Sequence, residues 1–311
     1  MRLLSDARKF AVLKRSKSIA GSALIYGLLA LLVYVIIFPF IAKISASFMS
    51  WNDMFDRTVT LIPRQPTLEN YRTVIKVTGY VKALGGSLLV STIAAIAQTF
   101  VCAMTGYALA KLKGKLAALV MFIVVLTILI PPQVILVPLF LKFRFFDIFG
   151  LFSSITGRTL NLIDSITPMT ILSIAGLGLK NGLYIFVMRQ FFKGVPEELE
   201  EAALMDGYGI FPSYIRIILP ISLPMLLTIF ILSFSWQWTD TFYSSIFFSS
   251  FPVVARTTFI MPSLGGYHET VYHANTLLHT GALLAIVPII ALFIVVQKWL
   301  VTGIERSGIV G

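Results

Sequence analysis

The chain has 311 residues, of which 57% are hydrophobic and only 13% are charged, with a formal net charge of +11. Soluble domains carry roughly 25% charged residues, so this composition excludes an ordinary soluble fold and indicates side chains that meet lipid or other apolar helices. The positive charge fits cytoplasmic loops beside a membrane better than a nucleic-acid partner, because no basic face lies outside the flanks of the apolar segments.

Six stretches of the sequence are long and apolar enough to cross a membrane, which takes roughly 20 helical residues. Five contain no Asp, Glu, Lys or Arg, namely residues 18–42, 83–110, 116–141, 217–239 and 270–297. The other, residues 165–188, has Lys180 as its only charge. The sequence therefore predicts an all-α integral membrane protein with six transmembrane helices.

The charges at the ends of these stretches predict the orientation of the chain. Residues 1–18 form a basic leader without a cleavage site of small residues, so the first span is expected to be retained and residues 19–311 to form one transmembrane domain. Lys and Arg also gather after the second and fourth spans and in the tail, which places both termini in the cytoplasm. The loop of residues 43–82 is basic too, but long loops cross largely regardless of charge.

Two features interrupt the apolar pattern. Residues 241–255 are uncharged but too short to span, and we expect a re-entrant or interfacial segment, with a seventh span as the alternative. Prolines at 131, 132 and 138 in the third span, and at 220 and 224 in the fifth, predict kinks. Such breaks are tolerated where neighbouring helices or a water-filled path satisfy the freed carbonyls, although a static bend explains each proline equally well.

Five of the 14 acidic residues lie between Glu197 and Asp206, in a loop expected in the cytoplasm. Pro196 suits the first position of a helix, the acids after it oppose the positive end of the helix dipole, and Gly207 can close the helix. The apolar side of this helix would consist of Leu199, Ala202, Ala203 and Met205. The pattern predicts a short helix outside the membrane, offered to a partner, while a solvated charged turn is the plainer alternative.

The spacing in this loop is specific. Glu201-Ala202-Ala203 is followed by three residues, Gly207, nine residues and then Ile217–Pro220. It resembles the signature loop of importer-type ABC permeases, in which a coupling helix docks into a groove of a cytoplasmic ATPase. The resemblance makes residues 193–220 the coupling loop and implies a coupling role for Glu201, Ala202, Ala203, Asp206, Gly207, Leu219 and Pro220. Tyr208 departs from the family, which usually has a small residue there.

Other segments are similar to sugar permeases of the maltose-transporter type. They are Pro66–Tyr71, Gln190–Pro196, Trp238–Asp240 (with Thr239 where the family has Asn) and the tail Thr302–Gly311, in which Glu305 and Arg306 depart from the pattern. The resemblance implies a bacterial inner or cytoplasmic membrane, a second permease subunit, two ABC ATPases and an extracytoplasmic solute-binding protein. Because no Gly-x-x-x-x-Gly-Lys-Ser/Thr motif occurs here, ATP and Mg are expected on the partner ATPase.

Catalytic and metal sites are not expected. His268, Glu269 and His273 lack the four-residue spacing that puts two ligands on one helical face. Cys102 is the single cysteine, which excludes an internal disulfide and suggests a small buried hydrophobe. No grouping typical of a serine hydrolase appears.

Two groups of residues are candidates for the substrate path. Lys180 and Asn181 lie deep in the fourth span, where a charge normally faces a cavity or a partner, unless Lys180 extends to the outer surface. Gly178 and Gly182 would allow a close helix contact there. The second group is Trp236, Gln237, Trp238 and Asp240, suited to sugar rings and hydroxyls, with an aromatic belt at the membrane interface as the alternative.

The function predicted from the sequence is thus a membrane subunit of an ATP-driven importer of sugars or oligosaccharides. The same type of permease for a polyol, glycerol phosphate or an acidic oligosaccharide is one alternative. An ATPase-independent secondary transporter or channel is another, but such proteins usually show inverted repeats, and none is evident in this sequence.

Overall fold

The computed structural model describes residues 2–255 and 271–308, and it describes the side chains of residues 21–255 and 274–298. Within these ranges the regular elements are helices, apart from one isolated bridge between Phe146 and Leu160. The chain divides into two compact units. The first comprises Met1–Thr73 and Gly265–Leu283, and the second comprises Val74–Leu264 and Leu284–Gly311.

The first unit contains the long N-terminal helix and the connection that follows it. Its helices are α1 (Arg2–Ser47), α2 (Trp51–Phe55), the start of α3 (Glu69–Thr78) and the start of α16 (Val271–Gly308). The buried amide of Asn70 donates to the carbonyls of Ser47 and Met49, at 3.0 and 2.9 Å, and the hydroxyls of Ser47 and Tyr71 lie 2.8 Å apart. The segment Pro66–Tyr71 therefore satisfies the carbonyls at the end of α1, which would otherwise lack partners.

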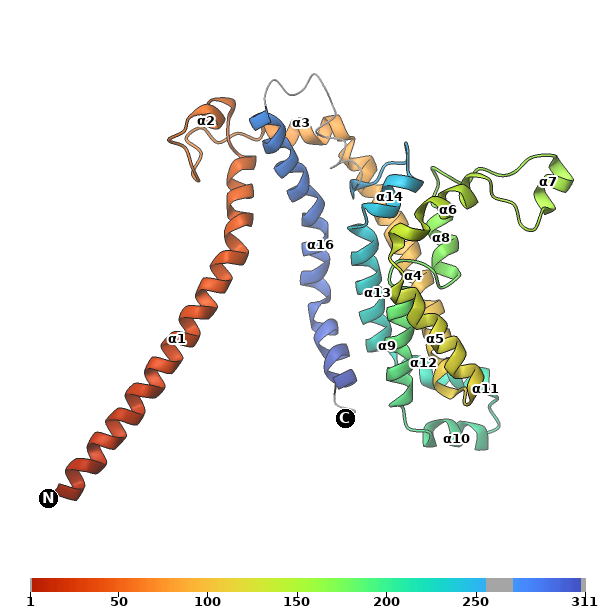
Figure 1. Ribbon diagram of the computed structural model, residues 1–311, viewed down its shortest axis with the longest axis horizontal. Coiled ribbons are helices and arrows are strands. Elements are labelled where there is room, and N and C mark those ends of the chain that lie inside the picture. Colours follow the sequence, from red (N-terminus) through yellow and green to blue (C-terminus); the bar gives the residue numbers. More distant parts are fainter. Residues whose placement is uncertain (1, 256–270, 309–311) are drawn as a thin grey trace. The chain divides into compact units, whose positions relative to one another are not determined.

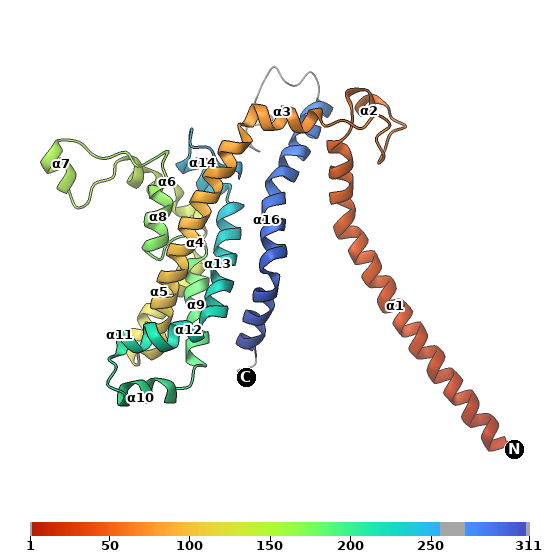
Figure 2. The same ribbon diagram turned by 180° about the vertical axis from the view of Figure 1, so that it is seen from behind.

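The second unit is a helical bundle organised around α4. Its helices are α4 (Tyr80–Lys111), α5 (Lys115–Leu129), α6 (Pro132–Arg144), α7 (Leu151–Thr156), α8 (Thr167–Ile174), α9 (Asn181–Lys193), α10 (Glu198–Met205), α11 (Ile210–Ser213), the π-helix η1 (Tyr214–Ile218), α12 (Leu219–Ile221), α13 (Leu223–Trp238) and α14 (Phe242–Phe247). Figures 1 and 2 show α10 at one end of this bundle and α14 at the other.

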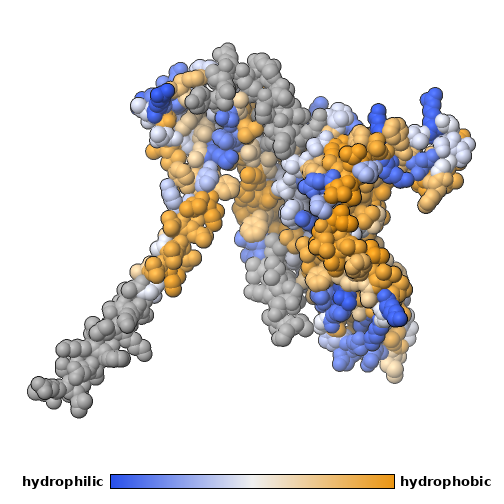
Figure 3. Space-filling model, viewed as in Figure 1, coloured by the Kyte–Doolittle hydropathy of each residue, from blue (hydrophilic) through white to orange (hydrophobic). Residues whose placement is uncertain are grey.

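Small residues on α4 let its neighbours pack closely. The helix contacts α8, α9 and α13, and a Cβ atom at Gly106 would lie only 2.6 Å from the Cβ of Met188 on α9. Hydrophobic side chains cover the middle of the unit, whereas hydrophilic side chains gather around α10 (Figure 3). Exposed Leu119, Phe122 and Ile123 on α5 belong to this apolar surface, as expected for a bundle whose outer face meets lipid.

Several of the predicted spans are bent or broken in the structure rather than formed by one straight helix. Among the residues with described side chains, three helical stretches are long and apolar enough to cross a membrane, namely Gly21–Ser47, Tyr80–Lys111 and Ala274–Lys298. Two bent pairs bring the number to five, with a bend of 97° between α5 and α6 and of 76° between Ile210–Ile221 and α13. The bends occur at Pro131-Pro132 and near Pro220 and Pro224, as the prolines predicted.

The prediction of one continuous helix over residues 165–188 is wrong. Helix α8 ends at Ile174 and α9 starts at Asn181, because Gly176 and Lys180 have left-handed φ angles of 72° and 62°. A right-handed helix cannot pass through such residues. Within residues 241–255, helix α14 has six residues, too few to span a membrane, which favours the re-entrant or interfacial interpretation over a seventh span.

Candidate functional site

The acidic helix α10 begins later than the sequence suggested. Its first residue is Glu198 and its N-cap is Glu197, so Pro196 lies outside the helix rather than at its first position. The other end is as predicted, because Gly207 has a left-handed φ of 83°. The amide of Tyr208 donates to the carbonyl of Ala203 and that of Gly207 to Leu204, both at 3.0 Å. This paired closure ends the helix sharply.

The two faces of α10 differ in what they expose. Ala203, 1% exposed, and half-buried Glu200 face the bundle. The remaining predicted coupling residues of this segment are exposed, and they are Glu201, Ala202, Asp206 and Gly207. Leu204 and Met205, 52% and 88% exposed, add an uncovered apolar surface. The outward face therefore combines carboxylates with apolar side chains, which suits a protein partner better than water alone.

Helix α10 is joined to the end of α4 by an ion pair. The Lys111 ammonium lies 3.0 Å from the Glu200 carboxylate, and the two side chains are 28% and 18% exposed. One turn before Lys111, the Tyr107 ring packs against Phe192 and Tyr214, with centroids 5.5 and 4.6 Å away. This ion pair was not predicted from the sequence. The helical spacing of the acids in α10 indicated only that one carboxylate would face the bundle, and it did not identify the partner.

The segment after α10 returns to the bundle through irregular helix. The π-helix η1 precedes the half-buried Leu219 and the exposed Pro220. Tyr208, the residue that departs from the ABC permease pattern, lies beside the Arg216 guanidinium, 5.3 Å from its ring centroid. The Tyr208 side chain therefore packs against Arg216 at the surface, and its size does not disturb α10.

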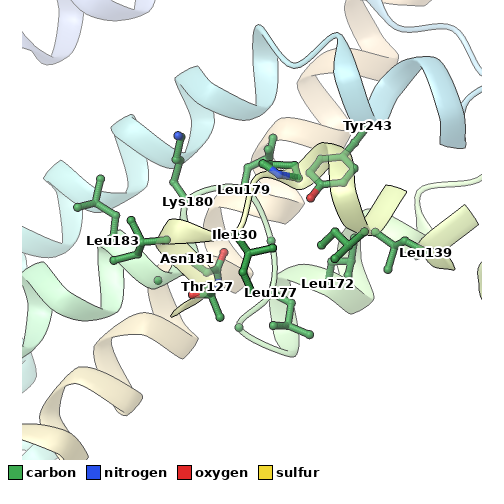
Figure 4. A pocket seen from close by; sticks show the side chains of 16 residues that line it. Thr127, Ile130, Leu139, Leu172, Leu177, Leu179, Lys180, Asn181, Leu183 and Tyr243 are labelled. Carbon is green, nitrogen blue, oxygen red and sulfur yellow. The ribbon is translucent and has the colours of Figure 1, made fainter. Parts of the chain in front are cut away.

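The break between α8 and α9 borders a cavity of about 360 Å³. Its lining comes from both broken helices, α5–α6 and α8–α9, and from Tyr243 on α14. Figure 4 shows the Tyr243 hydroxyl pointing into this space and Lys180 at its edge. Most of the lining is apolar, and Lys180 is its only charged residue.

Two predicted path residues from different helices meet beside this cavity. The Lys180 ammonium lies 4.7 Å from the ring centroid of Trp236 on α13. Both side chains are exposed in the isolated subunit. A cation over an indole face is attracted by the ring's quadrupole. The structure therefore joins these two candidate path residues in one cation–π contact.

The other predicted path residues are buried and bonded within the bundle. Trp238 donates through Nε1 to the Ala285 carbonyl at 3.0 Å, and Gln237 Nε2 lies 3.8 Å from the Met169 sulfur. The Asp240 carboxylate accepts from the amides of Phe242, Tyr243 and Ser244 and so closes the start of α14. Asn181 is 1% exposed. These contacts position helices, and none of the four side chains reaches an open surface.

A buried polar network beside the break was not predicted. Gln98 on α4 donates to the Ser173 hydroxyl on α8 at 3.3 Å and accepts from Ser233 on α13. Asn181 donates to the Ser173 carbonyl at 3.4 Å, while its Oδ1 atom is buried without a partner. Gln98 in an otherwise apolar span was the available signal, because polar groups inside membranes normally need partners.

Outside the spans, Asp164 fastens the loop before α8 to the segment after α14. It accepts from the amides of Ser250 and Phe251, at 2.8 and 2.6 Å, and from the Ser250 hydroxyl. Partial burial raises the pKa of Asp164, but these hydrogen bonds together outweigh it and lower the pKa to about 2.

Among the residues with described side chains, no group of three or more His, Cys, Asp or Glu could hold a metal ion. His268 and Glu269, and the side chain of His273, lie outside that part of the chain. Cys102 is buried on α4, with its sulfur 3.7 Å from the Asn181 carbonyl.

Broken apolar helices around an internal cavity are typical of membrane transport proteins. Residues 102–307 match the family described as "Binding-protein-dependent transport system inner membrane component", and the chain belongs to that family. It is therefore a transport subunit of the inner-membrane type, and the resemblance drawn from residues 201–220 is confirmed.

Individual relatives cover nearly the whole chain. "Inner membrane ABC transporter permease protein YcjP" of Escherichia coli K12 is 24% identical over 91% of this chain and 94% of its own. "Probable starch degradation products transport system permease protein AmyC" of Thermoanaerobacterium thermosulfurigenes is 29% identical over 87% and 90%. "Arabinooligosaccharides transport system permease protein AraQ" of Halalkalibacterium halodurans is 27% identical over 91% and 94%.

The fold also matches a solved structure. A chain of a bacterial ABC transporter involved in the import of the acidic polysaccharide alginate superposes with a TM-score of 0.70. The match covers 91% of this chain and 97% of that one, at 21% sequence identity. The ABC permease fold is therefore shared over almost the full length of both proteins.

Proposed function

We propose that this chain is one of two membrane subunits of an ATP-driven importer for a sugar or oligosaccharide. Family membership supports the importer class, and the names of the starch-product and arabinooligosaccharide relatives support the substrate class. The observation that carries the proposal is α10, a sharply capped helix whose exposed face bears Glu201, Ala202, Asp206 and Gly207 of the signature loop.

In this proposal the chain has six spans. They are α1, α4, the bent pair α5–α6, the broken pair α8–α9, the bent segment from α11 to α13, and α16. Both termini then lie in the cytoplasm of a bacterial cell, and α10 is a cytoplasmic coupling helix between the fourth and fifth spans. The basic leader and the Lys-rich loop at residues 111–115 support that orientation.

The partners would be a second permease, two ABC ATPases that bind ATP and Mg, and an extracytoplasmic solute-binding protein. ATP binding would draw the ATPases together and move α10 with them. The path would then open outward to receive sugar from the binding protein, and hydrolysis would reset it. Glu201, Ala202, Asp206 and Gly207 would face the ATPase, while Ala203 and Leu219 would hold the loop on the bundle and Pro220 would bend the chain before α13.

The test is co-purification with the two ATPases, followed by ATPase activity with and without the binding protein. We expect Glu201→Gln to weaken ATPase retention and to reduce stimulation, because it removes a charge from the docking face. The matched control is Glu69→Gln, an exposed acid at the start of α3. Unchanged retention and stimulation in Glu201→Gln would contradict the docking role.

Gly207→Ala tests the shape of the same segment. Its φ of 83° disfavours any residue with a Cβ atom, so alanine is expected to loosen the end of α10 and reduce ATPase stimulation. Gly157→Ala is the control. Gly157 also has a left-handed φ, of 69°, and it ends α7, which is not part of the coupling loop. Equal effects of the two variants on stimulation would remove the argument for α10.

A further inference from the structure

The cavity at the α8–α9 break has the size of a small-molecule site and carries one positive charge. Its volume of about 360 Å³ falls within the roughly 300–1,000 Å³ typical of such sites. Besides Lys180, the polar side chains in its lining are those of Thr127, Asn181 and Tyr243. A ligand here would meet mainly apolar walls and a few hydrogen-bonding groups, and Figure 4 shows Lys180 at the edge with its ammonium turned away from the other lining side chains.

No carboxylate in the described part of the chain neutralises this ammonium. The ion pairs found there join Arg64 to Asp56 and Lys111 to Glu200. Asp240, which follows α13, already accepts backbone hydrogen bonds at the start of α14. Lys180 instead rests on Trp236. A cation inside the membrane is costly unless it faces a cavity or an opposite charge, so Lys180 is available to an anion.

The geometry allows Lys180 to move while its backbone stays in place. Its left-handed φ of 62° fixes the start of α9, and its carbonyl accepts from the Tyr184 amide at 3.1 Å. The side chain above that anchor is flexible. Attraction to an indole ring is weaker than a charge-assisted hydrogen bond to a carboxylate. An arriving anion would therefore draw the ammonium off Trp236 and uncover the ring.

We propose that Lys180, Trp236 and the adjoining cavity form a subsite for an acidic sugar. The ammonium would bind the sugar carboxylate, and the uncovered indole would stack on the apolar face of the sugar ring. The inference rests on the proposed function, since it takes the ligand to be a carbohydrate, and it narrows that ligand to sugars with a carboxylate. A neutral sugar would leave the ammonium over the ring and the stacking face covered.

The experiment uses the assembled complex of permeases and ATPases in lipid nanodiscs. The probes are trigalacturonate and its fully methyl-esterified form, which have nearly the same shape but differ in charge, and binding is followed by calorimetry. Wild type is expected to prefer the acid by roughly 10- to 100-fold, the size of effect of one hydrogen bond to a charged group. Lys180→Met should abolish the preference, and Lys180→Arg should retain most of it.

Two further measurements separate this role from a structural one. Lys142→Met, at an exposed lysine on α6 outside the cavity, should leave the preference unchanged. The Lys142→Met complex should also keep the wild-type ATPase stimulation by the binding protein. Equal affinity for acid and ester in wild type, or no binding of the acid, would overturn the subsite while leaving the importer proposal intact. Loss of the second permease from the Lys180→Met complex would overturn it too, since Lys180 would then pair with an acid of that partner.

Discussion

The Lys111–Glu200 pair is the place where α10 can be uncoupled from the bundle without touching its outward face. We expect Glu200→Gln and Lys111→Met each to reduce the stimulation of ATPase activity by the binding protein. Glu200 lies on the inner side of α10, and its carboxylate is 3.0 Å from the ammonium of Lys111 at the end of α4, so neither change alters the predicted contact with the ATPase. Helix α10 would still dock on the ATPase, but without the ion pair its movement would be transmitted less directly to α4.

The expected magnitude follows from the burial of the pair. Exposed ion pairs contribute about 0.2–1 kcal/mol, and breaking a fully buried pair costs about 3–5 kcal/mol. Side chains that are 28% and 18% exposed lie between these limits, and we expect a coupling energy of about 1–2 kcal/mol. If stimulation depends on this attachment, that energy corresponds to a reduction of roughly 5- to 30-fold.

The assay is a double-mutant cycle on purified complexes, with the ratio of stimulated to basal ATPase activity as the readout. The charge-reversed variant Lys111→Glu/Glu200→Lys should recover much of the stimulation lost in either single reversal. Lys113→Gln is the matched control, because it removes an exposed positive charge two residues from Lys111. Additive effects of the two single substitutions, or normal stimulation in Glu200→Gln, would refute the reasoning.

Three further predictions concern stability. Gly106→Val should destabilise the bundle by about 1–3 kcal/mol, because its side chain would clash with Met188, whereas Gly85→Val on the same helix meets open space and should change the thermal midpoint little. Asn70→Ala should cost about 1–3 kcal/mol through two lost hydrogen bonds at the end of α1, measured by thermal unfolding in detergent. The pKa of Asp164 is lowered to about 2, so its contribution should persist above about pH 4, fade as the pH falls towards 2, and be absent at all pH values in Asp164→Asn, as followed by tryptophan fluorescence.

The sequence predicted those parts of the fold that depend on local chemistry. The C-terminal end of α10 is at the expected glycine, since only a residue tolerant of left-handed φ closes a helix this way. The bend between α5 and α6 falls at Pro131-Pro132 for a similarly local reason. The boundaries of elements are predicted less accurately, as Pro196 shows. A proline fits both the first turn of a helix and the position just before it, so it does not fix the first residue of α10.

The parts that could not be predicted depend on contacts distant in sequence. The mean hydropathy of residues 165–188 is that of a span, and it carries no information on the left-handed φ angles of Gly176 and Lys180, which break the helix. Gln98 finds its partners 75 and 135 residues along the chain. Likewise, nothing local to Trp236 indicated that it would meet Lys180, while Trp238 two residues later would be buried against the carbonyl of Ala285.

Helix α4 connects the proposed coupling helix α10 with the break beside the cavity. This helix carries Lys111, which holds α10, and Gln98, which is bonded to α8 at the break beside the cavity. Thirteen helical residues separate them, or about 20 Å along the axis. Because packed interiors resist compression and the Gly106 contact leaves no slack between α4 and α9, a displacement of Lys111 would move Gln98 with it. The break between α8 and α9, where regular helix is already absent, is where such a movement can be absorbed, and Lys180 is the last residue of that break.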